Sequence, residues 1–230
     1  MSGESVKLEA SDGHGLDAYQ SIPAGELRGG VVIIQEIFGV NHHIRAVVDQ
    51  YASAGYAAIA PSLFDRAQKG VELGYTPEGI SEGRGLVMKI GWDAPILDIE
   101  AAARAITART GKAPAVIGYC WGGSMVWLSA CRSGAVSCGV GYYGGQISMF
   151  VAEQPRVPVL LHFAEKDAYI PSADIEKIRG AHPEVEVHTY PAGHGFNCDE
   201  RKDYEPESAA LALKRTLAFL DKHLPGAGPR

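Results

Sequence analysis

Residues 30–35, GVVIIQ, form an almost unbroken run of apolar, mostly β-branched side chains. Such a run predicts a strand buried on both faces, because a strand with one wet face alternates apolar and polar residues. The next segment predicts a helix, since Asn41 can cap it, Ile44 and Val47 share one face, and Gly55 can end it. A doubly buried strand followed by a helix is typical of α/β folds.

The same strand-then-helix pattern recurs along the chain. Further strands are predicted at 56–61, 112–119, 136–143, 157–167 and 185–191, and further helices at 94–109, 121–132, 174–179 and 206–224. Near the start, Val6–Ala10 and Leu16–Ile22 flank the turn-forming residues SDGHG, which predicts an antiparallel hairpin. We therefore predict an α/β fold for residues 1–230: one domain with a mostly parallel central sheet, helices on both faces and an N-terminal hairpin.

Residues 62–93 are a long connection without a predicted strand. They contain six glycines, at 70, 74, 79, 83, 85 and 91, and are expected to hold one short helix. An excursion of this length is typical of a lid or a pocket wall. The last residues, 225–230, read PGAGPR and are expected to fray.

Composition and charge exclude several classes of protein. Hydrophobic residues make up 46% of the chain, which argues against disorder, and the net charge of −6 is spread along the chain, which argues against binding to nucleic acid. The start lacks a signal-peptide pattern and no apolar run is long enough to span a membrane, so we expect a cytoplasmic protein. The four cysteines form no C-x-x-C pair and are expected to be reduced.

A predicted strand runs directly into Gly118-x-Cys120-x-Gly122, and a predicted helix follows at once. This arrangement predicts a nucleophile elbow, in which a sharp turn exposes the central side chain and the flanking glycines avoid clashes. Cys120 would lie at a helix N-terminus, where free N–H groups and the helix dipole favour a thiolate. The backbone N–H of Trp121 could then face a developing oxyanion. The alternative is a small apolar cysteine in a glycine-rich turn.

A thiolate nucleophile needs a base and an acid that orients it. Among the eight histidines, His194 is the best candidate because it follows a predicted strand in PAGHGF, while the adjacent pair at 42 and 43 is expected to lie at the surface. Asp167 ends another strand and is preferred to Glu165 as the acid. The order Cys120, Asp167, His194 is the nucleophile–acid–base order of α/β-hydrolases. The structural alternatives are a turn cap for Asp167 and a turn-stabilising imidazole for His194.

Five motifs together carry a resemblance to a known family: QEIFG at 35–39, GYCWGG at 118–123, GYYG at 141–144, DAYIP at 167–171 and GHGF at 193–196. With the chain from about residue 4 to 224, they resemble the dienelactone hydrolases. The resemblance implies a monomeric α/β-hydrolase domain with a Cys120–Asp167–His194 triad, no cofactor or metal, and carboxymethylenebutenolidase activity.

The same resemblance implies roles for Glu36 and Ile37. Glu36 would contact the thiol at rest and be displaced to deprotonate it when substrate enters. The N–H of Ile37 would join that of Trp121 in the oxyanion hole. From the residues alone, Glu36 ends an apolar strand, where a carboxylate is costly to bury without a partner, so a salt bridge is the alternative.

Arginines would hold the anionic substrates that the resemblance implies, and Arg84 is similar to one such position. The second family arginine lies four residues after the histidine, where this chain has Cys198. Arg201 lies three residues further on. It could substitute for the missing arginine, because an arginine side chain reaches several ångströms, but a solvated surface residue is the favoured interpretation. Cys198 with His194 would supply only two metal ligands, which is too few for a metal site.

The leading hypothesis is therefore a cysteine-dependent hydrolase that opens a lactone through an acyl-enzyme on Cys120, acting on a small molecule without nucleic acid or membrane. One alternative is a broader carboxylic ester hydrolase with the same triad. A class I glutamine amidotransferase also uses G-x-C-x-G, but its H-x-E partner is missing because Gly195 and Phe196 follow His194. A catalytically silent ligand-binding protein of the same fold is the last alternative.

Overall fold

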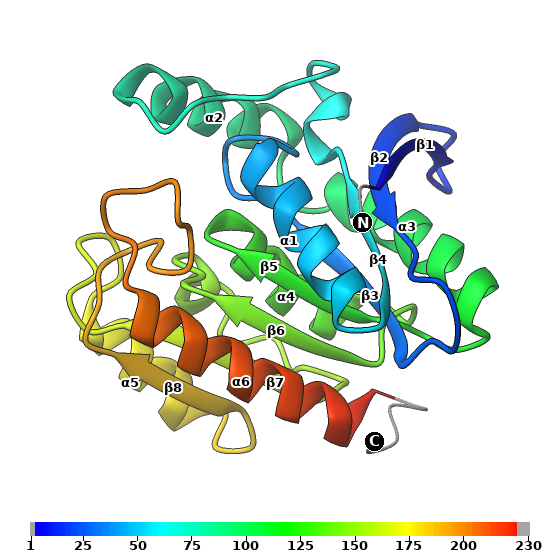
Figure 1. Ribbon diagram of the computed structural model, residues 1–230. Helices are drawn as coiled ribbons and strands as arrows, with labels where there is room; N and C mark the ends of the chain where they lie inside the picture. The colour runs from blue at the N-terminus through cyan, green and yellow to red at the C-terminus, as the bar shows by residue number, and fades with distance from the viewer. Residues whose placement is uncertain (1–2, 225–230) are drawn as a thin grey trace.

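The computed structural model describes residues 3–224 and is built on one eight-stranded sheet (Figure 1). The strands are β1 (Glu4–Glu9), β2 (Gly15–Ser21), β3 (Gly29–Ile34), β4 (Tyr56–Pro61), β5 (Ala115–Tyr119), β6 (Cys138–Tyr142), β7 (Val159–Ala164) and β8 (Glu186–Tyr190). Their order across the sheet is β1-β2-β4-β3-β5-β6-β7-β8. β1 pairs antiparallel with β2, and β2 with β4, while all other neighbouring strands are parallel. The predicted fold class and N-terminal hairpin are confirmed.

The helices connect these strands. They are α1 (His42–Ser53), α2 (Pro77–Ile90), α3 (Ala94–Thr110), α4 (Trp121–Arg132), α5 (Ser172–Ala181) and α6 (Pro206–His223), with two short 3₁₀ turns, η1 (Leu63–Arg66) and η2 (Ile147–Met149). In Figure 1, α1 and α6 lie in front of the sheet, α3 and α4 lie behind it, and α2 lies at the top, apart from the sheet. Both sheet faces are therefore covered, as the doubly apolar strands require. None of the described helices is long and apolar enough to cross a membrane.

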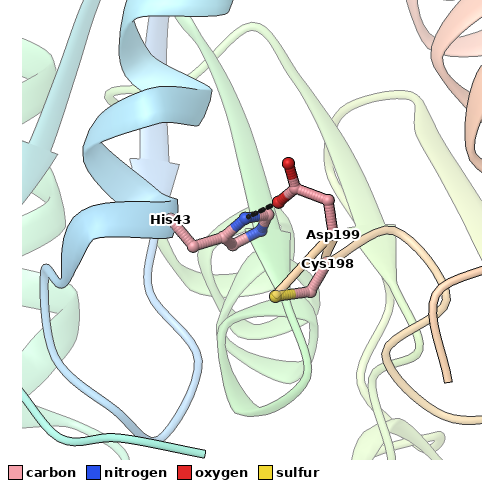
Figure 2. A group of neighbouring side chains, drawn as sticks. All are labelled: His43, Cys198 and Asp199. Carbon is pink, nitrogen blue, oxygen red and sulfur yellow. Dashed lines mark hydrogen bonds and ion pairs between the residues drawn. The ribbon is translucent and has the colours of Figure 1, made fainter. Parts of the chain in front are cut away.

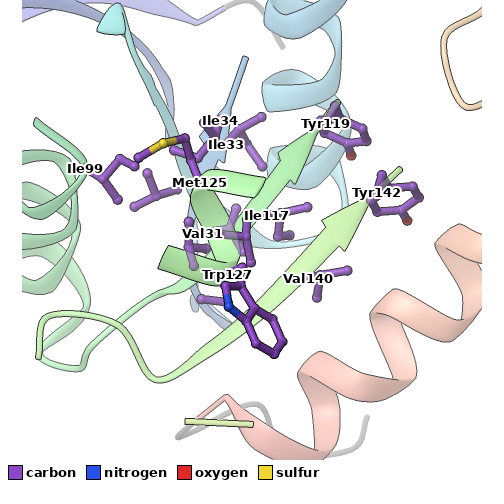
Figure 3. Close-up of a cluster of buried hydrophobic side chains, with 14 of the residues drawn as sticks. Val31, Ile33, Ile34, Ile99, Ile117, Tyr119, Met125, Trp127, Val140 and Tyr142 are labelled. Carbon is purple, nitrogen blue, oxygen red and sulfur yellow. The ribbon is translucent and has the colours of Figure 1, made fainter. Parts of the chain in front are cut away.

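The core follows from this layering. Val31 and Ile33 of β3, and Ile117 of β5, have no solvent exposure. Figure 3 shows these strands between two groups of side chains, with Met125 and Trp127 of α4 on one side and the tyrosines at the ends of β5 and β6 on the other. The central strands are thus held from both faces, which makes their carboxyl ends a rigid platform.

The sheet topology brings the predicted site residues to one edge. Because β3, β5, β7 and β8 are parallel, the segments that follow them leave the same edge of the sheet. Glu36 follows β3, Cys120 follows β5, Asp167 follows β7 and His194 follows β8. Ligand sites of open α/β sheets lie beyond this edge.

The long connection differs from the prediction. The single short helix expected in 62–93 is in fact the 3₁₀ turn η1 followed by α2, a helix of 14 residues. Thr76 caps α2 by accepting a hydrogen bond from the N–H of Gly79, and Pro77 takes the first helical position. The glycines obscured this helix in the sequence. Two of them are needed for packing, since a Cβ at Gly83 would lie 1.9 Å from the Ile37 carbonyl oxygen and one at Gly79 would lie 2.1 Å from that of Gly74.

Two glycines of α2 provide a matched test of this packing. Gly83→Ala is expected to destabilise the protein by about 1–3 kcal/mol, because the new methyl group overlaps a backbone carbonyl. Gly85→Ala meets no atom within 4 Å and is expected to stabilise it by about 0.5–1 kcal/mol, as alanine does in a helix interior. Urea unfolding of both variants measures the difference. Equal effects of the two substitutions would contradict the close approach of α2 to Ile37.

Candidate active site

The turn between β5 and α4 is strained. Cys120 has φ 55° and ψ −119°, a backbone conformation that residues other than glycine rarely adopt. The neighbouring glycines are required by contact, since a Cβ at Gly118 would lie 2.2 Å from the Gly122 carbonyl oxygen and a Cβ at Gly122 would lie 2.4 Å from that of Gln35. This is the geometry of a nucleophile elbow, with sulfur at its tip.

The structure brings the three predicted triad residues together. Nε2 of His194 lies 3.2 Å from Sγ of Cys120, and its Nδ1 lies 2.8 Å from Oδ2 of Asp167. Their side chains come from the segments after β5, β7 and β8, although 74 positions separate Cys120 from His194 in the chain. A nucleophile, a base and an orienting carboxylate are thus within hydrogen-bond reach of one another.

Backbone donors hold the carboxylate of Asp167 in place. Its side chain is fully buried, and Oδ1 accepts hydrogen bonds from the N–H groups of Tyr169, at 2.8 Å, and Ile170, at 3.2 Å. These bonds offset the cost of burying an anion and leave Oδ2 directed at His194. The alternative interpretation of Asp167 as a turn cap describes half of its role, since one oxygen caps the turn while the other contacts the imidazole.

His194 is 8% exposed and carries a strongly shifted pKa. Burial alone would lower its pKa, but the charge of Cys120 and the hydrogen bond to Asp167 raise the pKa of the imidazole to about 10. The site therefore favours an imidazolium held between two negative groups.

Glu36 has a different partner from the one the family resemblance implies. Its side chain is 1% exposed, and Oε1 accepts a hydrogen bond from Nη1 of Arg201 at 3.0 Å. Among the described residues no hydrogen bond joins Glu36 to the Cys120 thiol, which contacts His194 instead. The second oxygen, Oε2, is buried without a donor. Glu36 is therefore paired with Arg201 and not with Cys120. One of its carboxylate oxygens still lacks a hydrogen-bond donor.

The expectation that Arg201 is a solvated surface residue is wrong. Its side chain is 12% exposed, and the guanidinium lies 5.8 Å from the ring centroids of both Phe38 and Tyr75. It also packs on Gly195, where a Cβ would come within 2.8 Å of the guanidinium. The sequence missed this because Arg201 follows an irregular loop whose path no local pattern predicts.

The triad lies at a cavity of about 470 Å³ between the sheet edge and α2. Arg84 and Arg201 both line it, together with Cys120 and His194. The guanidinium of Arg84 lies 5.7 Å from the ring centroid of Tyr169, which in turn packs its ring 5.1 Å from that of His194. The remaining lining is mostly apolar, consisting of Ile37, Phe38, Ile80, Val87, Met88, Trp92, Trp121, Gly145, Gln146 and Tyr169 itself.

A second group of polar side chains joins the Arg201 loop to α1. Nδ1 of His43 lies 3.2 Å from Oδ1 of Asp199, and Cys198 lies beside them (Figure 2). His42 is exposed, as expected, but His43 is buried, so the prediction of a surface position is wrong for His43. One ligand atom from each of the three residues lies within 4.8 Å of the others, which is close enough for them to bind one metal ion. The helix dipole opposes a cation there, because the group lies at the N-terminus of α1. The sequence could not show this group because His43 is remote from Cys198.

Comparisons with known proteins agree with this geometry. Residues 16–224 match the model of the dienelactone hydrolase family. A carboxymethylenebutenolidase of Pseudomonas putida is 35% identical over 230 residues, covering 96% of this chain and 97% of that protein. Another from Cupriavidus pinatubonensis is 30% identical over 229 residues, covering 96% and 97%.

Solved structures give the same result. A Klebsiella pneumoniae protein, named provisionally as a dienelactone hydrolase, has a TM-score of 0.81 and 30% identity, covering 95% of this chain and 99% of that one. An esterase of Pyrococcus furiosus, at 15% identity and a TM-score of 0.69 over 96% of this chain and 92% of that one, shares the fold. The fold and the elbow define an α/β-hydrolase. The chain belongs to the dienelactone hydrolase family and is a hydrolase of that family.

The raised pKa of His194 predicts a pH dependence of stability. Because its pKa is about 6.5 when unfolded and about 10 when folded, the stabilisation from its proton is complete below pH 6.5 and is lost as the pH rises toward 10. The difference in unfolding free energy between wild type and His194→Gln should therefore shrink from pH 6 to pH 10. Urea titrations across this range measure it. A difference that stays constant or grows with pH would contradict the charged pair.

Proposed function

We propose that the protein hydrolyses a lactone or an activated ester that carries a carboxylate, through an acyl-enzyme on Cys120. The observation that carries this proposal is the Cys120–His194–Asp167 geometry on the wall of a cavity that two arginines also line. A thiolate, a positioned imidazole and an anion-binding side chain are the groups this reaction needs.

The first half-reaction forms the acyl-enzyme. The thiolate of Cys120 attacks the substrate carbonyl carbon, and the N–H groups of Ile37 and Trp121 stabilise the oxyanion that develops. When the intermediate collapses, the carbon–oxygen bond of the lactone or ester breaks. His194 gives its proton to the leaving oxygen, and a thioester remains on Cys120.

The second half-reaction releases the acid. Neutral His194, held by Asp167, takes a proton from water as the water attacks the thioester. The carbon–sulfur bond breaks, and Cys120 leaves as a thiolate beside the imidazolium. Substrate plus water gives the ring-opened acid, or an acid and an alcohol, so each step balances without a metal or cofactor. All these groups come from one chain, and the monomer and the single domain expected for residues 1–230 stay predictions.

The arginines give the proposal its substrate class. Arg201 pairs with Glu36, so a substrate carboxylate that binds Arg201 would compete for the same guanidinium. In the resting pair the proton of Cys120 already lies on His194, so Glu36 is not needed as the base, and its release from Arg201 would leave a carboxylate beside the site that lacks a donor on one oxygen. Arg84 extends into the same cavity from α2 and offers a second cation to the substrate. Arg201 thus takes the place of the arginine that Cys198 replaces.

Relatives named carboxymethylenebutenolidase support a dienelactone as the substrate, with a broader ester hydrolase as the alternative. A dienelactone hydrolase and a broader ester hydrolase would use the same mechanism and differ only in the substrate that the cavity binds. A glutamine amidotransferase is disfavoured by Gly195 and Phe196 after the histidine, where that chemistry needs H-x-E.

The first test compares hydrolysis of cis- and trans-dienelactone and a simple aryl ester by wild type and Cys120→Ala. Loss of the nucleophile is expected to reduce kcat by at least about 10³-fold for every substrate that the wild type turns over. Turnover of the aryl ester alone would retain the mechanism and replace the dienelactone by a broader ester. Full activity of Cys120→Ala would refute the proposal, and a wild type that binds but never turns over would indicate a silent binding protein.

The second test concerns the charge of Arg201. Arg201→Gln should reduce kcat/KM for a carboxylate-bearing lactone by about 10- to 100-fold, because a charge-assisted hydrogen bond is lost, and affect a neutral ester much less. Arg104, an exposed arginine of α3, provides the matched control as Arg104→Gln, which should change neither. Equal losses of kcat/KM for charged and neutral substrates would show that Arg201 stabilises the structure of the site and does not bind the substrate carboxylate.

A further inference from the structure

We propose that the natural substrate carries, besides its carboxylate, an aryl or comparably large apolar group that lies against an apolar wall of the cavity. The wall consists of Val87 and Met88 of α2, Trp92 and Trp121. This inference rests on the proposed hydrolase function and extends it to the second end of the substrate.

One face of α2 builds the roof of the cavity. Ile80, Arg84, Val87 and Met88 all line it, at positions i, i+4, i+7 and i+8 of the helix. Arg84 is the one charged residue on this face. Beyond it the helix presents only the side chains of Val87 and Met88, and Trp92 continues the surface two residues after the helix ends.

Aromatic rings hold the wall in place. The ring of Trp92 lies 5.1 Å from that of Phe150 and 6.4 Å from that of Trp121, measured between centroids. Trp121 stacks on Phe64 at 5.7 Å. Flat rings fixed at these distances form a preorganised surface for a further ring.

The cavity separates charge from apolar surface. The guanidinium of Arg201 contacts Phe38 and Tyr75, and that of Arg84 contacts Tyr169, so neither has a cation–π contact with a ring of the wall. Cys120 precedes Trp121 directly and therefore lies where the wall begins. A substrate with a carboxylate at one end of its scissile bond and an aryl group at the other would match both parts.

The size of the cavity supports this two-ended substrate. Its volume of about 470 Å³ falls in the range of sites for drug-sized ligands, whereas a dienelactone is a single five-membered ring with a short acidic arm. Met88 borders the wall with 83% of its surface exposed, and methionine adapts its shape to varied apolar groups. Trp121 is only 2% exposed, so the surface open to a ligand comes mainly from the half-buried side chains of Val87 and Trp92 and from Met88. This apolar surface beside a nucleophile gives the binding free energy that a larger substrate would use.

The test uses two matched pairs of carboxylate-bearing esters. Phenyl and 2-naphthyl hydrogen succinate place the carboxylate on the acyl side, and the carboxymethyl esters of phenylacetic and 2-naphthylacetic acid place it on the alcohol side. In at least one pair the naphthyl ester is expected to have a kcat/KM about tenfold higher or more, after correction for the hydroxide-catalysed rates. Trp92→Ala and Met88→Ala should each reduce this preference severalfold.

The matched control is Met149→Ala. Met149 is also an exposed methionine, at 70%, but it lies outside the cavity lining, so its removal should leave the naphthyl preference unchanged. Wild-type ratios near one in both pairs, or ratios that Trp92→Ala and Met88→Ala leave unchanged, would overturn the proposal.

Binding to Cys120→Ala separates this proposal from the hydrolase mechanism. The intact esters can be titrated into this variant by calorimetry, and the naphthyl member of the preferred pair should bind about tenfold tighter than the phenyl member. Tighter naphthyl binding without wild-type turnover would refute the mechanism and retain the wall. Cys120-dependent turnover with equal binding in both pairs would retain the mechanism and refute the wall.

Discussion

The strained turn at Cys120 is the constraint on which the site depends. A side chain held at φ 55° costs on the order of 1–3 kcal/mol, and the surrounding structure has to supply that free energy. It does so through β5, which is buried and paired on both sides, and through hydrogen bonds that join the turn to its neighbours: the N–H of Cys120 donates to the Tyr142 carbonyl, and that of Gly123 to the Cys120 carbonyl. The sheet and α4 therefore position the sulfur more rigidly than a free loop could.

Around this turn the protein buries an unusual number of charges. Asp167, His194, Glu36 and Arg201 are all nearly or fully removed from water, and each has a partner of opposite charge. Removing any one of them would leave another buried without compensation, which costs several kcal/mol. The two ion pairs also differ in purpose. Backbone donors satisfy the carboxylate of the His194–Asp167 pair, whereas the Glu36–Arg201 pair leaves one carboxylate oxygen unsatisfied. The Glu36–Arg201 pair is therefore the one that the proposed carboxylate substrate would rearrange.

The sequence predicts the part of this arrangement that local patterns carry. The apolar strands, the glycine-flanked cysteine and the order of the triad residues follow from periodicity and from the ends of parallel strands. The structure confirms the fold and brings Cys120, Asp167 and His194 within hydrogen-bond distance, while their catalytic roles stay a prediction. The positions of Arg201 and His43 could not be predicted, because loop paths and the packing of a loop on α1 depend on contacts between remote segments. The extent of α2 was missed for a related reason: Gly79 and Gly83 lower helix propensity locally, yet they are required where the helix meets backbone carbonyls.

The central claim is that Cys120 carries the acyl group during turnover. Intact-protein mass spectrometry on samples quenched during hydrolysis of a slow aryl ester tests it most directly, with His194→Ala used to retard deacylation. The account predicts an adduct with the mass of the acyl group, located on the peptide that contains Cys120 and absent from Cys120→Ala. Steady turnover without any adduct in either protein, or an adduct on another residue, would contradict it.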